Sequence, residues 1–175
     1  MLRLLGQRLV RALGTAPRAR DWLLAGSVLT VFTAVALIVG FVSGLLHVSM
    51  PADPGRQALF ALVAVIVPCL GEEVLFRVLL VPHPDEPGPW VGWASVSVLL
   101  FALWHPLNAA LLLPHAWPLF ADPRFILLTV LLGAGLVLLY RRTGSIWPAV
   151  AVHWAVVVTW KAFLSGPVFL FGDAG

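Results

Sequence analysis

Gly71-Glu72-Glu73-Val74-Leu75-Phe76-Arg77 places two adjacent carboxylates and one guanidinium inside an apolar run that begins near Ala58 and ends at Val81. Residues 58–67 carry no charge, and residues 78–81 are all apolar. A charge at the centre of a membrane helix costs about 2.5–3.5 kcal/mol on insertion scales, so a chain rarely carries three without a use for them. The stretch therefore predicts a membrane helix with a polar centre, and the remaining helices are expected to enclose it.

The composition of the whole chain supports a membrane protein. Of its 175 residues, 61% are hydrophobic and 11% are charged, whereas a soluble domain carries roughly 25% charged residues. The mean hydropathy is +0.98. The basic residues gather at the ends of apolar runs, as membrane topology requires, and form no nucleic-acid footprint. We therefore expect an integral membrane protein of the all-α class, a polytopic helical bundle that binds no nucleic acid.

The apolar runs predict one membrane domain over residues 1–175 with about five spans. The expected spans are 22–46, 57–81, 90–104, 124–140 and 146–163. Residues 1–21 form an amphipathic segment with leucines between arginines, and residues 57–164 form the core. Pro68 is expected to kink the second span just before the carboxylates. The third span is expected to end or bend at His105, which precedes a proline, and to lead into a broken or re-entrant segment over 106–122.

The distribution of basic residues predicts the orientation in the membrane. With the amino terminus inside, seven arginines of the loops and termini lie in the cytoplasm, and Arg56, Arg124 and Lys161 lie outside. This asymmetry favours a cytoplasmic amino terminus and an outside carboxyl terminus. The five arginines that precede the first acidic residue suit an anionic cytoplasmic leaflet. We expect the plasma membrane of a bacterium.

The ionisable residues within the apolar runs suggest a division of roles. Glu73 and Arg77 lie four residues apart on one helix face and can pair. Glu72 points about 100° away from Glu73, so we expect it to face a cavity and to seek a different partner. His105 and His153 are the candidate partners from other spans. A carboxylate in such a dry site is suited to taking and returning a proton.

The depths of these residues agree only in part when every helix is drawn straight and upright. Glu72 then lies roughly 13 Å from the cytoplasmic end of its span, and His153 lies roughly 10 Å into its own. His105 lies roughly 22 Å along the third span. It would then lie one or two helical turns higher than Glu72 and His153, unless that span tilts.

Three motifs now carry a resemblance to a known family. They are Glu72-Glu73-x-x-x-Arg77, then Phe101-x-x-x-His105, and then His153, which follows Thr143-Gly144-Ser145-Ile146-Trp147-Pro148. In this order on membrane helices they resemble the motifs of the CPBP (ABI) family of intramembrane glutamic endopeptidases, which includes the CAAX prenyl endopeptidases. The resemblance extends over about residues 57–161.

The resemblance implies a peptide hydrolysis mediated by water. Glu72 matches the glutamate that activates the water together with His105. Glu73 and Arg77 match the supporting members of the first motif. His153 matches the histidine that polarises the scissile carbonyl or steadies the oxyanion. The implied partners are the lipid bilayer and a protein or peptide substrate, with or without a lipid attached.

The sequence departs from the family at one position and leaves other functions open. The family carries Asn or Asp four residues after the last histidine, where this chain has Val157, which donates no hydrogen bond. Val157 favours a non-catalytic scaffold or a bacteriocin-immunity-type factor as one alternative. A proton-coupled transporter is a second alternative. Two glutamates and two histidines can also hold a divalent metal, but the H-E-x-x-H spacing is absent, so no cofactor or metal is expected.

Overall fold

All regular elements in the described part of the chain are helices. The computed structural model describes residues 2–50 and 53–164. The main helices are α1 (Leu2–Gly14), α2 (Ala19–Ser43), α3 (Pro54–Ala64), α5 (Val91–Leu111), α7 (Pro123–Thr143) and α8 (Trp147–Phe163). The short segments are the π-helical η1 (Val65–Leu70), α4 (Gly71–Glu73), the π-helical η2 (Val74–Val78), the 3-10 turn η3 (Pro114–Ala116) and α6 (Trp117–Phe120).

Helix lengths confirm the predicted polytopic bundle. Within the described residues, four stretches are long and apolar enough to cross a membrane, namely Ala19–Ser43, Pro54–Val78, Val91–Leu111 and Pro123–Thr143. The fifth predicted span corresponds to α8, whose 17 residues rise about 25 Å. The amphipathic segment expected at the amino terminus contains α1.

The second span bends where proline was expected to bend it. The backbone of Val67 leaves the helical region, with φ −129° and ψ 114°, and Pro68 has no N–H to donate to the preceding turn. The indole of Trp154 on α8 donates to the carbonyl oxygen of Ala61 at 2.7 Å. α8 therefore holds the part of the span before the bend, and the bend separates it from Glu72 and Glu73.

The predicted break at His105 is wrong. α5 continues through His105 and Pro106 to Leu111, and the irregular segment begins only at Leu112 and contains η3 and α6. A residue before proline is biased away from the helical region but not excluded from it. Packing against α7 along its length, together with a bond from Ser97 Oγ to the Phe76 carbonyl oxygen at 2.6 Å, outweighs this local bias.

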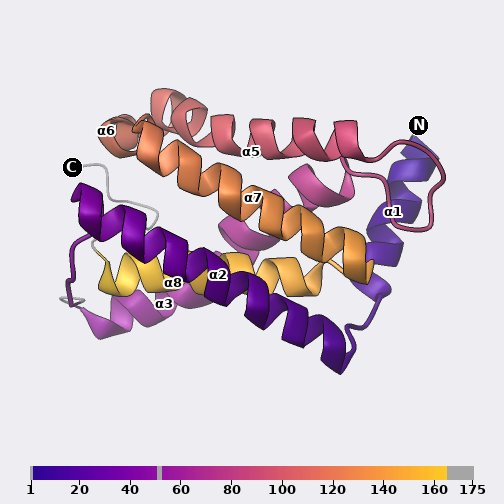
Figure 1. The fold of residues 1–175 in the computed structure, drawn as a ribbon, viewed down its shortest axis with the longest axis horizontal. Coiled ribbons are helices and arrows are strands. Elements are labelled where there is room, and N and C mark those ends of the chain that lie inside the picture. Colours follow the sequence, from indigo (N-terminus) through magenta and orange to yellow (C-terminus); the bar gives the residue numbers. More distant parts are fainter. Residues whose placement is uncertain (1, 51–52, 165–175) are drawn as a thin grey trace.

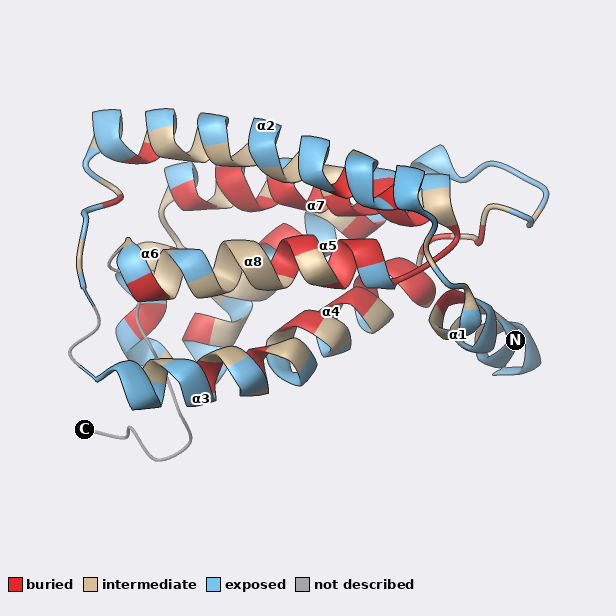
Figure 2. Ribbon diagram, turned by 90° about the horizontal axis from the view of Figure 1, so that it is seen from below, coloured by how far each residue is buried: buried red, intermediate tan, exposed pale blue. Residues whose placement is uncertain are grey.

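α7 and α8 each pack against several other helices. α7 packs against α2, α5 and α8, and nine of its 21 residues are buried, a larger share than in the other candidate spans (Figure 2). α2 lies beside α7 and slopes in the same direction in the ribbon view (Figure 1), and it leaves most of its outer face exposed, as a lipid-facing helix does. α8 packs against α2, α3 and η1 as well, so side chains at its middle can meet those of Glu72 and Glu73.

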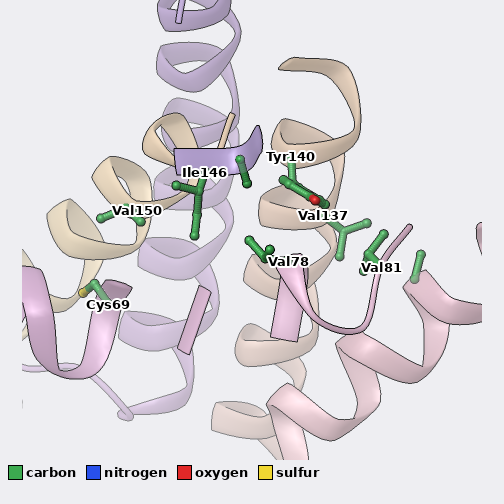
Figure 3. Packing of buried hydrophobic residues seen from close by; sticks show 9 residues of the cluster. Cys69, Val78, Val81, Val137, Tyr140, Ile146 and Val150 are labelled. Carbon is green, nitrogen blue, oxygen red and sulfur yellow. The ribbon is translucent and has the colours of Figure 1, made fainter. Parts of the chain in front are cut away.

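One end of the bundle gathers α1, residues 79–90 and the turn between α7 and α8. The backbone N–H of Ile146 donates to the Ala12 carbonyl oxygen at 3.1 Å, and the indole of Trp147 donates to that of Leu13 at 2.9 Å. A buried apolar cluster lies beneath α1 and includes Ala12, Tyr140 and Ile146 (Figure 3). α1 is therefore docked on the bundle.

An ion pair fixes α1 at this end. Nε and Nη2 of Arg8 donate to the two carboxylate oxygens of Glu86 at 2.8 and 2.6 Å, and Nη1 donates to the Leu79 carbonyl oxygen at 3.1 Å. At the opposite end, Arg124 donates to the Ser43 carbonyl oxygen. α1 and Arg124 thus lie at opposite ends, as the arginine distribution predicts. The absolute orientation stays a prediction, and the carboxyl terminus lies outside the described residues.

The Arg8–Glu86 pair predicts a pH-dependent stability. Hydrogen bonds from Arg8 hold the pKa of Glu86 below its ordinary value of 4.5. Because this pKa is lower in the folded state, the stabilisation is complete above about pH 4.5 and is lost as the pH falls through the folded pKa. We expect Arg8→Gln to lower the thermal unfolding midpoint at neutral pH, by a margin that shrinks below about pH 4.5. Arg3→Gln, on the exposed face of α1, is the control, and a margin that does not change with pH would contradict the prediction.

Candidate functional site

Glu73 forms the centre of a buried polar cluster. Its Oε2 lies 3.2 Å from Nε of Arg77, and both side chains are fully buried. Its Oε1 lies 2.9 Å from Nδ1 of His153 on α8. The predicted pairing of Glu73 with Arg77 is confirmed. The same carboxylate also holds a histidine from another helix, which the spacing within one helix did not predict.

Close packing around Arg77 depends on a glycine of α7. The guanidinium lies over the ring of Phe101 at 4.2 Å from its centroid. A Cβ atom at Gly133 would lie 3.1 Å from Cδ1 of Phe101 and 3.6 Å from Nη2 of Arg77. An alanine at position 133 would therefore make the Phe101 ring shift by a few tenths of an ångström, while its contact with the guanidinium would be an ordinary one. Among the described residues, Nη1 and Nη2 of Arg77 have no hydrogen-bond acceptor, so its charge is compensated by the nearby carboxylates, Glu73 above all, and by the Phe101 ring.

Removal of the guanidinium is expected to destabilise the protein strongly. Arg77→Met leaves Glu73 buried without its cation, which costs about 3–5 kcal/mol of unfolding free energy. The free energy can be measured by titration with dodecyl sulfate, followed by circular dichroism.

The double variant Glu73→Gln/Arg77→Met is the matched control. It removes both charges and keeps an acceptor for His153, so it is expected to recover part of the loss. A double variant as unstable as Arg77→Met would show that the ion pair is not the source of the effect.

Glu72 is held by two partners from other helices. Its Oε1 accepts a hydrogen bond from the indole Nε1 of Trp104 at 3.1 Å. Its Oε2 lies 3.8 Å from Nε2 of His153 and is buried, without a hydrogen-bond partner among the described residues. Glu72 therefore has one oxygen fixed by a donor and one oxygen that faces an imidazole nitrogen.

His105 joins this cluster through an aromatic ring. Its Nδ1 lies 3.0 Å from the Phe101 carbonyl oxygen. The Phe101 ring lies edge-on to both His105 and His153, with centroids 5.2 and 5.6 Å away. Both histidines therefore pack against the same ring, although straight, upright helices would place His105 one or two helical turns higher. In the described part of the chain, no hydrogen bond or ion pair links His105 to Glu72.

The hydrogen bonds fix which ring nitrogens can act on a substrate. A carbonyl oxygen only accepts, so Nδ1 of His105 donates, and its Nε2 is left with a lone pair when the ring is neutral. By the same argument Nδ1 of His153 donates to the Glu73 carboxylate. Nε2 of His153, beside Glu72, accepts a proton in the neutral ring and donates one in the charged ring.

An apolar cavity of about 260 Å³ opens beside the two histidines. Most of its lining is apolar and comes from α2, α7 and α8. Phe101, His105, His153 and Val157 also line it. Glu72 is not among the lining residues of this cavity, so the expectation that it faces a cavity stays a prediction. His153 lies between the carboxylates and the cavity.

The chemistry available at the site is proton transfer next to an apolar chamber. Two carboxylates, a guanidinium and two imidazoles come from four helical segments to one buried region. No group of three or more His, Cys, Asp or Glu residues arranged to hold a metal ion occurs in the ranges 2–50 and 53–164.

Two residues of the site had roles that sequence analysis missed. Phe101 was identified only as part of a motif, and the role of Trp104 was not predicted. Their contacts with Arg77, His153 and Glu72 cross between helices, so no periodicity within one span predicts them. The nearest signal was the single polar atom of Trp104, because a buried indole N–H usually finds an acceptor.

Comparison with known proteins identifies one match. The model of the family described as "Type II CAAX prenyl endopeptidase Rce1-like" matches residues 54–159, more than half of the chain. The match covers every residue of the buried cluster and both histidines. No curated protein and no solved structure matches the chain.

Proposed function

Because the chain belongs to the Rce1-like family of type II CAAX prenyl endopeptidases, we propose that it hydrolyses a peptide bond of a membrane-associated protein or peptide by means of a water molecule activated at Glu72. The family is one of membrane proteases, and the membrane-spanning helices agree with that class of activity. The glutamic mechanism and the residue roles below are our proposal for this chain.

The observation that carries the proposal is the unpaired Oε2 of Glu72. This buried atom lies 3.8 Å from Nε2 of His153. One water oxygen can lie within hydrogen-bond distance of both atoms, since ordered waters commonly bridge polar groups that are too far apart for a direct bond. The indole of Trp104 on Oε1 leaves Oε2 as the oxygen that can accept the proton of water.

In the proposed reaction, Glu72 takes a proton from the water while the water oxygen bonds to the scissile carbonyl carbon. The peptide C–N bond then breaks, and the proton passes from Glu72 to the leaving nitrogen. His105 assists by accepting a hydrogen bond from the water through Nε2, which orients the water without removing a second proton. His153 donates from Nε2 to the carbonyl oxygen, where negative charge develops. Glu73 holds the ring of His153 in place and its negative charge favours a donating Nε2, while Arg77 holds Glu73.

The apolar cavity supports a substrate with a hydrophobic portion. His105 and His153 line it together with apolar side chains, so a chain seated there lies beside the proposed catalytic groups. We propose a cytoplasmic amino terminus, with the reaction in the half of a bacterial plasma membrane nearer the cytoplasm, because the arginines of α1 and of the last turn of α7 lie at one end.

The proposal is tested by comparing the membrane proteomes of strains that carry the wild-type protein and Glu72→Gln. We expect an uncut precursor to accumulate in the variant strain, and the purified wild-type protein should cleave that precursor. Cleavage of equal extent by Glu72→Gln would overturn the proposal.

Val157 favours a second candidate function, a non-catalytic membrane scaffold that binds a partner protein. It lines the cavity with His153 and provides no donor for an oxyanion. On this hypothesis, Glu72→Gln and His105→Ala would keep both the cellular phenotype and the captured partner, whereas the protease hypothesis predicts that both variants lose the phenotype.

A further inference from the structure

α1 has three faces with different surroundings. With about 100° of rotation per residue, Arg8 and Ala12 lie on the face docked against the bundle. Ala12 is fully buried, and Arg8 is occupied by Glu86 and by the Leu79 carbonyl oxygen. This arginine therefore belongs to the protein interior and is not available to a membrane surface.

The second face of α1 is apolar and exposed. Leu2, Gly6 and Val10 follow one another at four-residue spacing and form an apolar stripe. Gly6, at the centre of the stripe, lies about 160° around the helix from Arg8. Leu2 is 83% exposed and Val10 is 73% exposed. α1 is docked on the bundle, yet Leu2 and Val10 remain uncovered by protein. Side chains of this kind are expected to contact an apolar environment outside the protein.

The third face carries the charge. Arg3, Gln7 and Arg11 are all exposed and lie next to the apolar stripe, on the side away from Ala12. A helix at a membrane interface has this order of faces, with its apolar stripe towards acyl chains and its arginines towards phosphates.

The other exposed charged side chains at this end of the bundle are also mostly positive. Arg18, Arg20 and Arg142 are exposed there. The acidic side chains nearby are engaged, since Glu86 pairs with Arg8 and Asp21 accepts from the Arg18 backbone. Asp85 remains 74% exposed beside His83. The positive charge on this surface thus exceeds the negative charge.

We propose that α1 is a binding site for the headgroups of anionic phospholipids. Arg3 and Arg11 contact the phosphates, Leu2 and Val10 enter the outer part of the acyl region, and the bidentate Arg8–Glu86 pair fixes the helix at that depth. The charge complementarity and the position at the end of membrane-spanning helices favour a bilayer surface over a protein partner. The proposal is independent of the proposed function.

The test uses the full chain with Val10→Cys, labelled with a fluorophore whose emission responds to polarity. The native Cys69 is fully buried, so the label attaches at position 10. The protein is placed in nanodiscs of phosphatidylcholine alone or of an equal mixture of phosphatidylcholine and phosphatidylglycerol. We expect emission at shorter wavelength and weaker quenching by aqueous iodide in the mixture, and a smaller difference at high salt.

Charge variants in the same labelled protein complete the test. Arg3→Gln/Arg11→Gln is expected to lose the lipid-dependent shift, and Arg3→Lys/Arg11→Lys is expected to keep it. Arg56→Gln removes an exposed positive charge at the opposite end and should keep it too. Circular dichroism checks that each variant retains its helix content.

Three outcomes would overturn the proposal. An equal signal in both nanodiscs would mean that protein covers this face, as a second copy of the chain would. A shift produced by inorganic phosphate in phosphatidylcholine nanodiscs would indicate a site for free anions. A shift that survives in the folded Arg3→Gln/Arg11→Gln variant would remove these arginines from the interaction.

Discussion

Glu72→Gln is expected to lower the turnover rate of the precursor by about 100–10,000-fold, the range in which a positioned general base contributes. Glutamine has nearly the same shape and keeps an oxygen for the Trp104 indole, which binds Oε1 of Glu72 at 3.1 Å. It has no carboxylate to take a proton from water. The loss should therefore appear in kcat, with little change in KM, because the substrate contacts of the apolar cavity do not involve Glu72.

The matched control for this variant is Glu86→Gln, the same chemical change in the loop that holds α1. It is expected to reduce stability and to leave kcat per folded molecule unchanged. Purified proteins at equal folded concentration, assayed by mass spectrometry of the cleaved precursor, give the comparison. Equal rates for Glu72→Gln and wild type would remove Glu72 from the reaction, whatever the effect on stability.

Val157→Asn is expected to increase the rate of hydrolysis by about 100–1,000-fold, the usual contribution of one oxyanion donor. Val157 lies four residues after His153, on the same face of α8, and both side chains line the cavity. An amide at position 157 can donate a hydrogen bond next to Nε2 of His153, where the proposal places the oxyanion. The gain should appear in kcat, because the charge develops only in the transition state.

Val157→Leu is the control, since it changes the size of the side chain without adding a donor and should show no gain. The measurement is kcat for the precursor that the proteome comparison identifies. An unchanged rate in a folded Val157→Asn protein would show that another group already stabilises the oxyanion. A loss of rate would show that the cavity must remain apolar at this position.

Much of the fold follows from patterns within single spans. Long apolar runs predicted the helices, Pro68 predicted the bend at Val67, and the four-residue spacing of Glu73 and Arg77 predicted their pairing. Each of these is set by chain geometry over a few residues. The exception is His105, where the local bias before a proline was overcome by packing of α5 on α7.

The arrangement of the site was less predictable, because it depends on contacts between helices. The sequence indicated Glu72, His105 and His153 as candidates, but it could not show that His153 lies closer to Glu73 than to Glu72. It also could not show that Trp104 binds Glu72. These contacts depend on the rotation and tilt of whole helices, which periodicity does not determine.

The short length of α8 has a consequence for how water reaches the site. Its 17 residues rise about 25 Å, whereas α2, with 25 residues, rises about 37 Å, and the hydrocarbon layer of a bilayer is about 30 Å thick. A hydrophobic segment shorter than the membrane thins the bilayer around it. The lipid next to α8 is therefore expected to be compressed, which shortens the path from the aqueous phase to the carboxylates that hold His153.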